Sequence, residues 1–165
     1  MTATALRHRK PTAEADALEL YDALNGLVRV YQFRDRDRIC CHDVSVTQCY
    51  ALEALVKIGP CTLNQLAAEL YLDKSTASRV VGTLERKGYV ARTRHPRDQR
   101  AVLLAATTAG QKLYAKITES LVAERRQILT TFPPEVRAGA AELIRRLTEA
   151  VKARSAYEAA VQQPA

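Results

Sequence analysis

The sequence predicts a mainly α-helical protein with one small β-hairpin, and three observations lead to this fold class. Apolar residues recur at steps of three and four along most of the chain, as on the buried face of a helix. Two short β-prone runs, 89–94 and 100–105, flank the polar residues 95–99, which is typical of a hairpin. The 165 residues include no Trp and two Phe, so Leu, Val, Ile and Ala must build most of the core, and these residues suit helices.

The N-terminal part predicts a loose arm and one long helix. Residues 1–12 mix small, polar and basic side chains. A single apolar helical face then runs from residue 13 to Tyr31. The alternating charge run at 34–38 predicts a solvated helix end or a linker.

Capping signals place the next three helices. The capping-box pattern, a serine or threonine followed three residues later by glutamine, begins at Ser45 and at Thr62 and opens helices at 46–58 and 63–70. Asp73 caps a third helix, which Gly88 ends.

Two further helices follow the hairpin. Thr107 or Thr108 caps a long helix, which Pro133-Pro134 ends, and another helix begins at Glu135. The apolar spacing of the last helix is close to that of a coiled-coil seam, which would stay exposed in a lone chain. The seam therefore predicts a second copy as its partner, although folding back onto its own domain is the alternative.

Positive charge is concentrated between Lys74 and Arg100. Eight basic residues against two acidic residues give this window a net charge of +6, where the whole chain carries +7. Charge focused on one helix and one hairpin predicts a polyanion as partner, and DNA is the natural candidate. A solvated surface without a partner is the alternative.

The order of elements resembles that of the MarR family of bacterial winged-helix regulators. The resemblance rests on the run TLNQLAAELYLDKSTASRVVGTLERKGYV from Thr62, on Asp98-Gln99-Arg100 as the family's wing motif, and on Thr107 and Gly110 at the start of the long helix. It covers about residues 13–155. It implies a winged helix-turn-helix fold and a homodimer in which the first and last helices of the two chains interleave.

This resemblance divides the chain into five parts. They are an N-terminal arm (1–12), a dimerisation helix (13–38), a DNA-binding lobe (39–107), C-terminal dimerisation helices (108–157) and a frayed tail (158–165).

The residues expected to contact double-stranded DNA lie on the outer face of the third helix and on the wing. Arg79 has the forked side chain that suits the guanine O6/N7 pair, whereas Lys74 and Arg86 lie nearer the phosphates. Either Arg97 or Arg100 can enter the minor groove. The resemblance favours Arg100 as the inserted residue, with Asp98 bracing the arginine cluster. The full set is Lys74, Ser75, Thr76, Ser78, Arg79, Arg86, Arg94, Arg97, Asp98 and Arg100.

A group of three cysteines and a histidine is the second candidate site. Cys40, Cys41, His42 and Cys49 lie within ten residues. They can bind zinc, copper(I) or a trivalent metalloid, act as a thiol redox switch, or pack as small apolar side chains. We expect the start of the helix at 46 to lower the pKa of the Cys49 thiol. Cys61 is expected to pack.

These patterns predict a cytoplasmic transcriptional regulator that acts as a repressor under the control of an effector. The effector can be a thiophilic metal at the cysteine group or, as in much of the family, a small aromatic molecule. No catalytic constellation is visible, so an enzyme is not expected. No apolar run is long enough to span a bilayer, so no membrane partner is expected. A passive architectural DNA-binding protein is the alternative from another class.

Overall fold

The computed structural model describes residues 12–40, 42–94 and 102–161. The chain divides into two compact units, residues up to Ile117 and residues from Thr118 onward, and each is described by itself. Its elements are α1 (Ala13–Cys40), α2 (Val46–Ile58), α3 (Leu63–Glu69), α4 (Lys74–Arg86), β1 (Val90–Arg94), β2 (Val102–Ala106), α5 (Thr108–Leu129) and α6 (Pro134–Val161).

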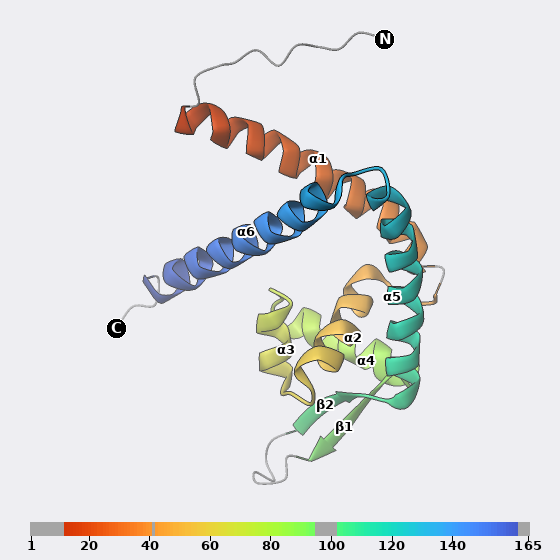
Figure 1. The fold of residues 1–165 in the computed structure, drawn as a ribbon. Coiled ribbons are helices and arrows are strands. Elements are labelled where there is room, and N and C mark those ends of the chain that lie inside the picture. Colours follow the sequence, from red (N-terminus) through yellow and green to blue (C-terminus); the bar gives the residue numbers. More distant parts are fainter. Residues whose placement is uncertain (1–11, 41, 95–101, 162–165) are drawn as a thin grey trace. The chain divides into compact units, whose positions relative to one another are not determined.

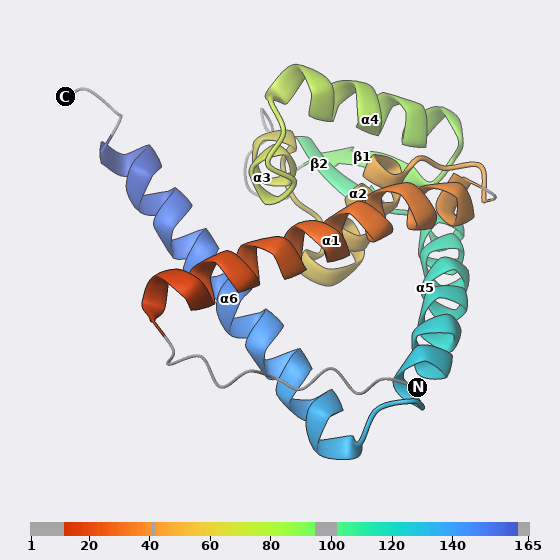
Figure 2. The same ribbon diagram turned by 90° about the horizontal axis from the view of Figure 1, so that it is seen from above.

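The first unit contains a small lobe in which α2, α3 and α4 gather beside the β1–β2 hairpin (Figures 1 and 2). Its centre consists of apolar side chains from every one of these helices and from β2 and α5. The largest fully buried side chains are Leu52, Leu66, Val81, Leu84, Leu104 and Ile117. The core is therefore built from aliphatic residues, as the composition predicted.

Both predicted capping boxes are present. The Ser45 hydroxyl accepts a hydrogen bond from the Gln48 amide at 3.2 Å, and the Gln48 side chain accepts one from the Ser45 amide at 3.1 Å. Thr62 and Gln65 form the same reciprocal pair at 3.3 and 2.8 Å. These bonds satisfy amides that have no partner within the first turn, so they fix where α2 and α3 begin.

The two strands form an antiparallel hairpin in which Val90 pairs with Ala106 and Arg94 with Val102. Cys61 adds one residue to the other edge of β2, since its backbone exchanges two hydrogen bonds with Leu104, at 3.1 and 2.8 Å. This bridge fastens the hairpin to the segment between α2 and α3. The wing tip, 95–101, lies outside the described residues.

The start of α5 is fixed to the end of α4. The Thr107 hydroxyl donates a hydrogen bond to the carbonyl of Gly88 at 2.7 Å and accepts one from the Gly110 amide at 3.1 Å. The Thr107 amide donates to the carbonyl of Tyr89 at 3.0 Å. Of the two predicted caps, Thr107 is therefore the one that closes the first turn of α5.

Two helix ends differ from the sequence prediction. α1 continues through the charge run at 34–38 to Cys40, so the run is helical and is not a linker. At the other end α6 continues to Val161 rather than 157. The arm at 1–11 and the end of the tail at 162–165 lie outside the described residues.

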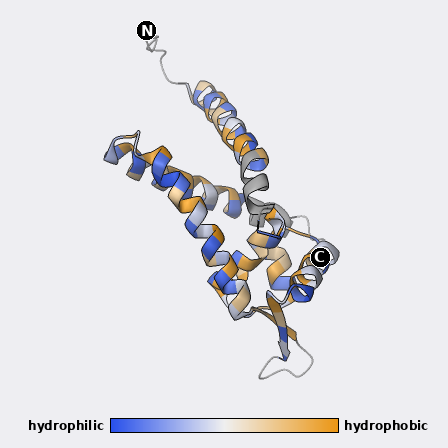
Figure 3. Cartoon of the chain, turned by 90° about the vertical axis from the view of Figure 1, so that its right-hand side faces the viewer, coloured by the Kyte–Doolittle hydropathy of each residue, from blue (hydrophilic) through white to orange (hydrophobic). Residues whose placement is uncertain are grey.

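Apolar and polar residues alternate along α1 (Figure 3), and many large apolar side chains of α1 and α6 are exposed. Leu18, Tyr21 and Phe33 of α1 are each more than 60% exposed, and Val151 of α6 is 65% exposed. Among the described residues, no helix combines the length and the apolar character that a membrane crossing needs.

Candidate nucleic-acid interface

The N-terminus of α4 is held by the carboxylate of Asp73. Its Oδ1 accepts hydrogen bonds from the Thr76 amide at 2.8 Å and from the Ser75 hydroxyl at 2.7 Å. These two donors lower the pKa of Asp73 well below its ordinary value, because they favour the charged carboxylate. The Ser75 hydroxyl is therefore part of the cap, although its side chain remains exposed.

Two threonine–arginine pairs follow each other along α4. Nη2 of Arg79 donates a hydrogen bond to Oγ1 of Thr76 at 3.1 Å, and Nη2 of Arg86 donates one to Oγ1 of Thr83 at 3.0 Å. The second pair lies seven residues after the first, which is close to two full helical turns, so both pairs lie on one face. The Thr83 hydroxyl also donates to the carbonyl of Arg79 at 3.1 Å.

Ion pairs separate the basic residues of the lobe into two groups. Nε of Arg92 lies 2.8 Å from Oε1 of Glu85, and Nζ of Lys87 lies 3.2 Å from Oδ1 of Asp43. By contrast, no carboxylate among the described residues lies within ion-pair distance of Arg79 or Arg86. The positive charge that α4 presents outward therefore includes two arginines that no described carboxylate pairs with.

The structure brings the predicted α4 residues together on one helix. Thr76 and Ser78 are half-buried, and the others that it describes, Lys74, Ser75, Arg79, Arg86 and the strand residue Arg94, are exposed. Arg97, Asp98 and Arg100 lie outside the described residues.

Sequence reasoning missed Thr83 on this surface, and it missed an unusual residue in the turn before α4. Thr83 holds Arg86, and the signal that could have found it is the repeat of a threonine and an arginine three residues apart. Tyr71, in the turn between α3 and α4, is 71% exposed and has a φ of 53°. This left-handed backbone is strained for a bulky residue, and such strain is often found at functional surfaces.

Comparison with known proteins identifies the lobe. Residues 42–101, from the residue after the cysteine pair to the wing, match the profile of the MarR family. Over these residues the chain is similar to MarR family proteins.

Curated proteins with similar sequences are named as regulators of the helix-turn-helix type. The chain is 33% identical over 94 residues to the HTH-type transcriptional regulator SarZ of Staphylococcus saprophyticus, a match that covers 57% of this chain and 62% of that protein. An uncharacterized HTH-type regulator of Mycobacterium leprae is 29% identical over 136 residues, covering 81% of this chain and 92% of the relative. Other curated relatives are matched over only 38–51% of their length, so the chain spans about half of them.

Solved structures share the fold. A MarR family protein from Bacillus stearothermophilus superposes with a TM-score of 0.77 at 24% identity, over 86% of this chain and 99% of the other. The mainly α-helical winged helix-turn-helix fold predicted from the sequence is therefore confirmed.

The cysteines of this chain do not all share one environment. Cys49, in the first turn of α2, is 5% exposed, and burial together with the nearby charge of Glu53 raises the pKa of its thiol to about 11. The prediction that the helix N-terminus lowers this pKa is wrong, because the loss of water around the thiolate outweighs the helix dipole. Cys61 is also buried, as predicted, and burial raises its pKa.

The remaining members of the predicted cluster are only partly described. Cys40 ends α1, but Cys41 lies outside the described residues, and His42 is half-buried beside it. Within the part of the chain that the structure describes, no three His, Cys, Asp or Glu side chains lie close enough to hold a metal ion. Metal binding at the cluster stays a prediction.

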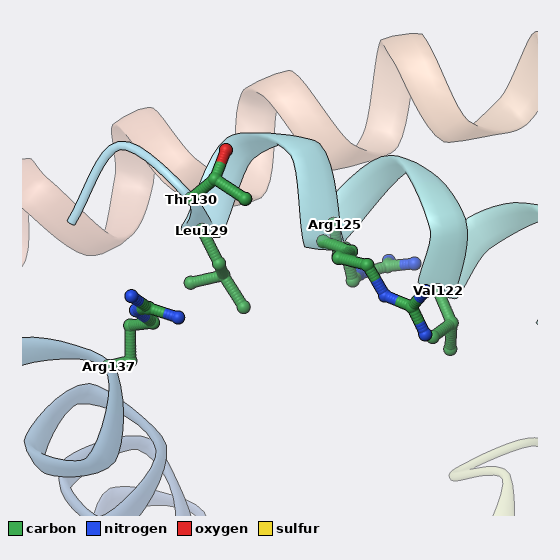
Figure 4. A pocket seen from close by; sticks show the side chains of 6 residues that line it. Val122, Arg125, Leu129, Thr130 and Arg137 are labelled. Carbon is green, nitrogen blue, oxygen red and sulfur yellow. The ribbon is translucent and has the colours of Figure 1, made fainter. Parts of the chain in front are cut away.

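One hollow lies in the second unit, at the turn between α5 and α6, and has a volume of about 420 Å³ (Figure 4). Its lining combines Val122 and Leu129 with the arginines 125, 126 and 137, and Nε of Arg137 donates a hydrogen bond to the carbonyl of Phe132 at 2.8 Å. None of the residues predicted to bind DNA or metal lines this hollow.

Proposed function

We propose that the chain is a sequence-specific DNA-binding transcriptional regulator that binds a two-fold symmetric operator as a homodimer. The observation that supports this proposal is the outer face of α4, where two exposed arginines bond threonines and have no described carboxylate within ion-pair distance. The curated relatives are named as transcriptional regulators, which favours this class of protein over an enzyme.

The second helix of a helix-turn-helix enters the major groove and meets base edges with its N-terminal half. Arg79 lies in that half of α4 and is suited to a guanine, whereas Arg86 lies in the last turn and is suited to a phosphate. Arg94 extends the basic surface onto β1 and toward the wing. The interface therefore combines a base-reading group with phosphate-binding groups, which a sequence-specific protein needs and a passive architectural protein does not.

A second copy of the chain is the partner we propose for α1 and α6. Apolar side chains recur along both helices, and many of them are about half exposed in a single chain. Monomeric proteins rarely leave such extended apolar surfaces in water, and a two-fold interface between identical copies covers them. A homodimer also carries two copies of α4, one for each of two half-sites that lie about one DNA turn apart.

The proposal is tested by selecting binding sites from a random duplex library with the full chain. We expect the recovered sequences to contain an inverted repeat that one dimer, of twice 18.3 kDa, protects in footprinting. Arg79→Ala should weaken binding to the selected duplex by about 5- to 150-fold, because a good arginine–guanine pair contributes about 1–3 kcal/mol.

Arg92→Ala is the matched control, since it removes the same charge from an arginine that Glu85 already neutralises. We expect it to weaken binding less than Arg79→Ala does. Recovery of no enriched sequence, together with equal binding of both variants, would refute a sequence-specific regulator and favour architectural binding.

Repression and effector control remain predictions within this proposal. An effector must bind the DNA-free shape more tightly than the DNA-bound shape in order to release the operator. Adding zinc, copper(I), arsenite, peroxide and an aromatic acid in turn to the complex with the selected duplex distinguishes metal, redox and aromatic control. No response to the first four would leave packing as the role of the cysteines.

A further inference from the structure

We infer that Thr76 and Thr83 are positioning residues that hold Arg79 and Arg86 ready for DNA. This inference rests on the proposed function. It assigns to Thr76 a role through Arg79 rather than a direct contact with a base, and it adds Thr83 to the interface.

The first argument is the geometry of the two pairs. Each guanidinium bonds the threonine three residues before it, at 3.1 Å for Arg79 and 3.0 Å for Arg86. Each arginine tip is therefore drawn back over the preceding helical turn, toward the end of α4 that enters the groove. The seven-residue repeat separates the two tips by about 10.5 Å along one face.

The second argument is that one bond leaves the guanidinium able to bind DNA. The group has five N–H donors, and the bond to a threonine uses one of them. An unused edge remains for the two acceptors of a guanine or for a phosphate. A carboxylate in place of the threonine would also hold the arginine, but it would neutralise the positive charge of the guanidinium, as Glu85 does for Arg92.

The third argument concerns the hydroxyl of Thr83. Because it donates its proton to the carbonyl of Arg79 at 3.1 Å, its oxygen lone pairs are left for Arg86. The orientation of the hydroxyl is thus fixed by the helix itself. An unbraced arginine would lose this order, and ordering a long side chain on binding costs about 0.5–1.5 kcal/mol, which corresponds to about a 2- to 12-fold weaker complex.

The experiment is a pair of double-mutant cycles on the selected duplex, labelled with fluorescein and titrated by anisotropy with the full dimer. Thr76→Val and Thr83→Val remove the hydroxyls with little change of volume or helix propensity, and Thr76→Ser and Thr83→Ser keep them. We expect each valine variant to bind about 2- to 12-fold more weakly, and each serine variant to regain affinity. When Arg79 is already alanine, Thr76→Val should change the affinity less than twofold. When Arg86 is already alanine, Thr83→Val should likewise change the affinity less than twofold.

Two further readouts separate positioning from a loss of folding. Thr76→Val should relax discrimination at the base that Arg79 reads, and Arg86→Ala should reduce the slope of log affinity against log salt by about 1. Valine effects that simply add to the arginine effects would overturn the inference and leave the proposed function intact. Binding that neither arginine variant weakens would instead overturn the proposed function.

Discussion

Replacing Gly110 with alanine should separate the start of α5 from the end of α4. A Cβ added at this glycine would lie 2.2 Å from the carbonyl oxygen of Tyr89 and 3.1 Å from its carbonyl carbon. The obstacle is backbone, so no side chain can turn away to relieve it. Moving the contact from 2.2 Å to the ordinary 3.4 Å requires a shift of about 1.2 Å.

Such a shift breaks what fastens the two segments together. The Thr107 amide lies 3.0 Å from the carbonyl of Tyr89, and its hydroxyl lies 2.7 Å from that of Gly88, so both bonds would stretch beyond useful length. Overpacking costs about 1–3 kcal/mol, and each lost bond about 1 kcal/mol. Alanine's better helix propensity returns about 1 kcal/mol. The net loss of stability is about 2–4 kcal/mol.

Urea unfolding followed by circular dichroism at one protein concentration measures this loss, since a dimer's stability depends on concentration. Gly82→Ala is the matched control in the same lobe. Its added Cβ would lie 3.8 Å from Nη1 of Arg86, an ordinary contact, so the free energy of unfolding should rise by about 1 kcal/mol. An unfolding midpoint of Gly110→Ala equal to or above that of the parent would refute the reasoning.

Three further predictions concern the same lobe. The free energy of unfolding of Tyr71→Gly should exceed that of Tyr71→Ala by about 1 kcal/mol, because only glycine adopts a φ of 53° without strain. Equal urea midpoints of the two variants would show that the turn relaxes. Asp73→Asn keeps a side chain that can cap the start of α4 but removes the ionisable carboxyl group. The lowered pKa of Asp73 stabilises the fold above its ordinary value of 3.8, and this contribution is lost as pH falls through the lowered folded pKa. Unfolding midpoints measured across this acid range should therefore fall less for Asp73→Asn than for the parent, and identical profiles would contradict it. In a Cys40→Ser, Cys41→Ser variant, Cys49 and Cys61 should not react with a disulfide reagent at pH 8 until urea unfolds the chain, because burial raises both thiol pKa values; rapid labelling of the native protein would show that Cys49 opens to solvent.

The sequence predicted the elements whose signals are local. A serine or threonine with glutamine three residues later fixes a helix start by bonds within four residues, so Ser45 and Thr62 were placed correctly. The outer face of α4 followed from helical periodicity in the same way. Gly110 was noticed only as part of a family pattern, and Thr107 only as one of two possible caps, because their partners Tyr89 and Gly88 lie about twenty residues away.

The failures have a different physical origin. The pKa of Cys49 depends on how much water reaches the thiol, and burial is a property of the folded lobe that proximity to a helix start does not reveal. The charge run at 34–38 was taken for a solvated helix end or a linker; alternating charges are compatible with a continuous helix, and α1 passes through them, so the linker alternative is wrong. The ion pair of Arg92 with Glu85 joins β1 to α4. A charge count along the sequence does not reveal that these two residues are paired.

The contacts of the first unit show how α4 is held. Two contacts hold the residues that follow α4. Lys87 pairs with Asp43, which lies just before α2, and the carbonyl of Gly88 accepts a hydrogen bond from Thr107 at the start of α5. Neither contact lies on the face that carries Arg79 and Arg86. A movement of the start of α2 or of α5 must therefore either break one of these contacts or carry α4 with it. Effector control of DNA binding needs no contact with the arginines themselves, only a different affinity of the effector for two positions of these helix starts.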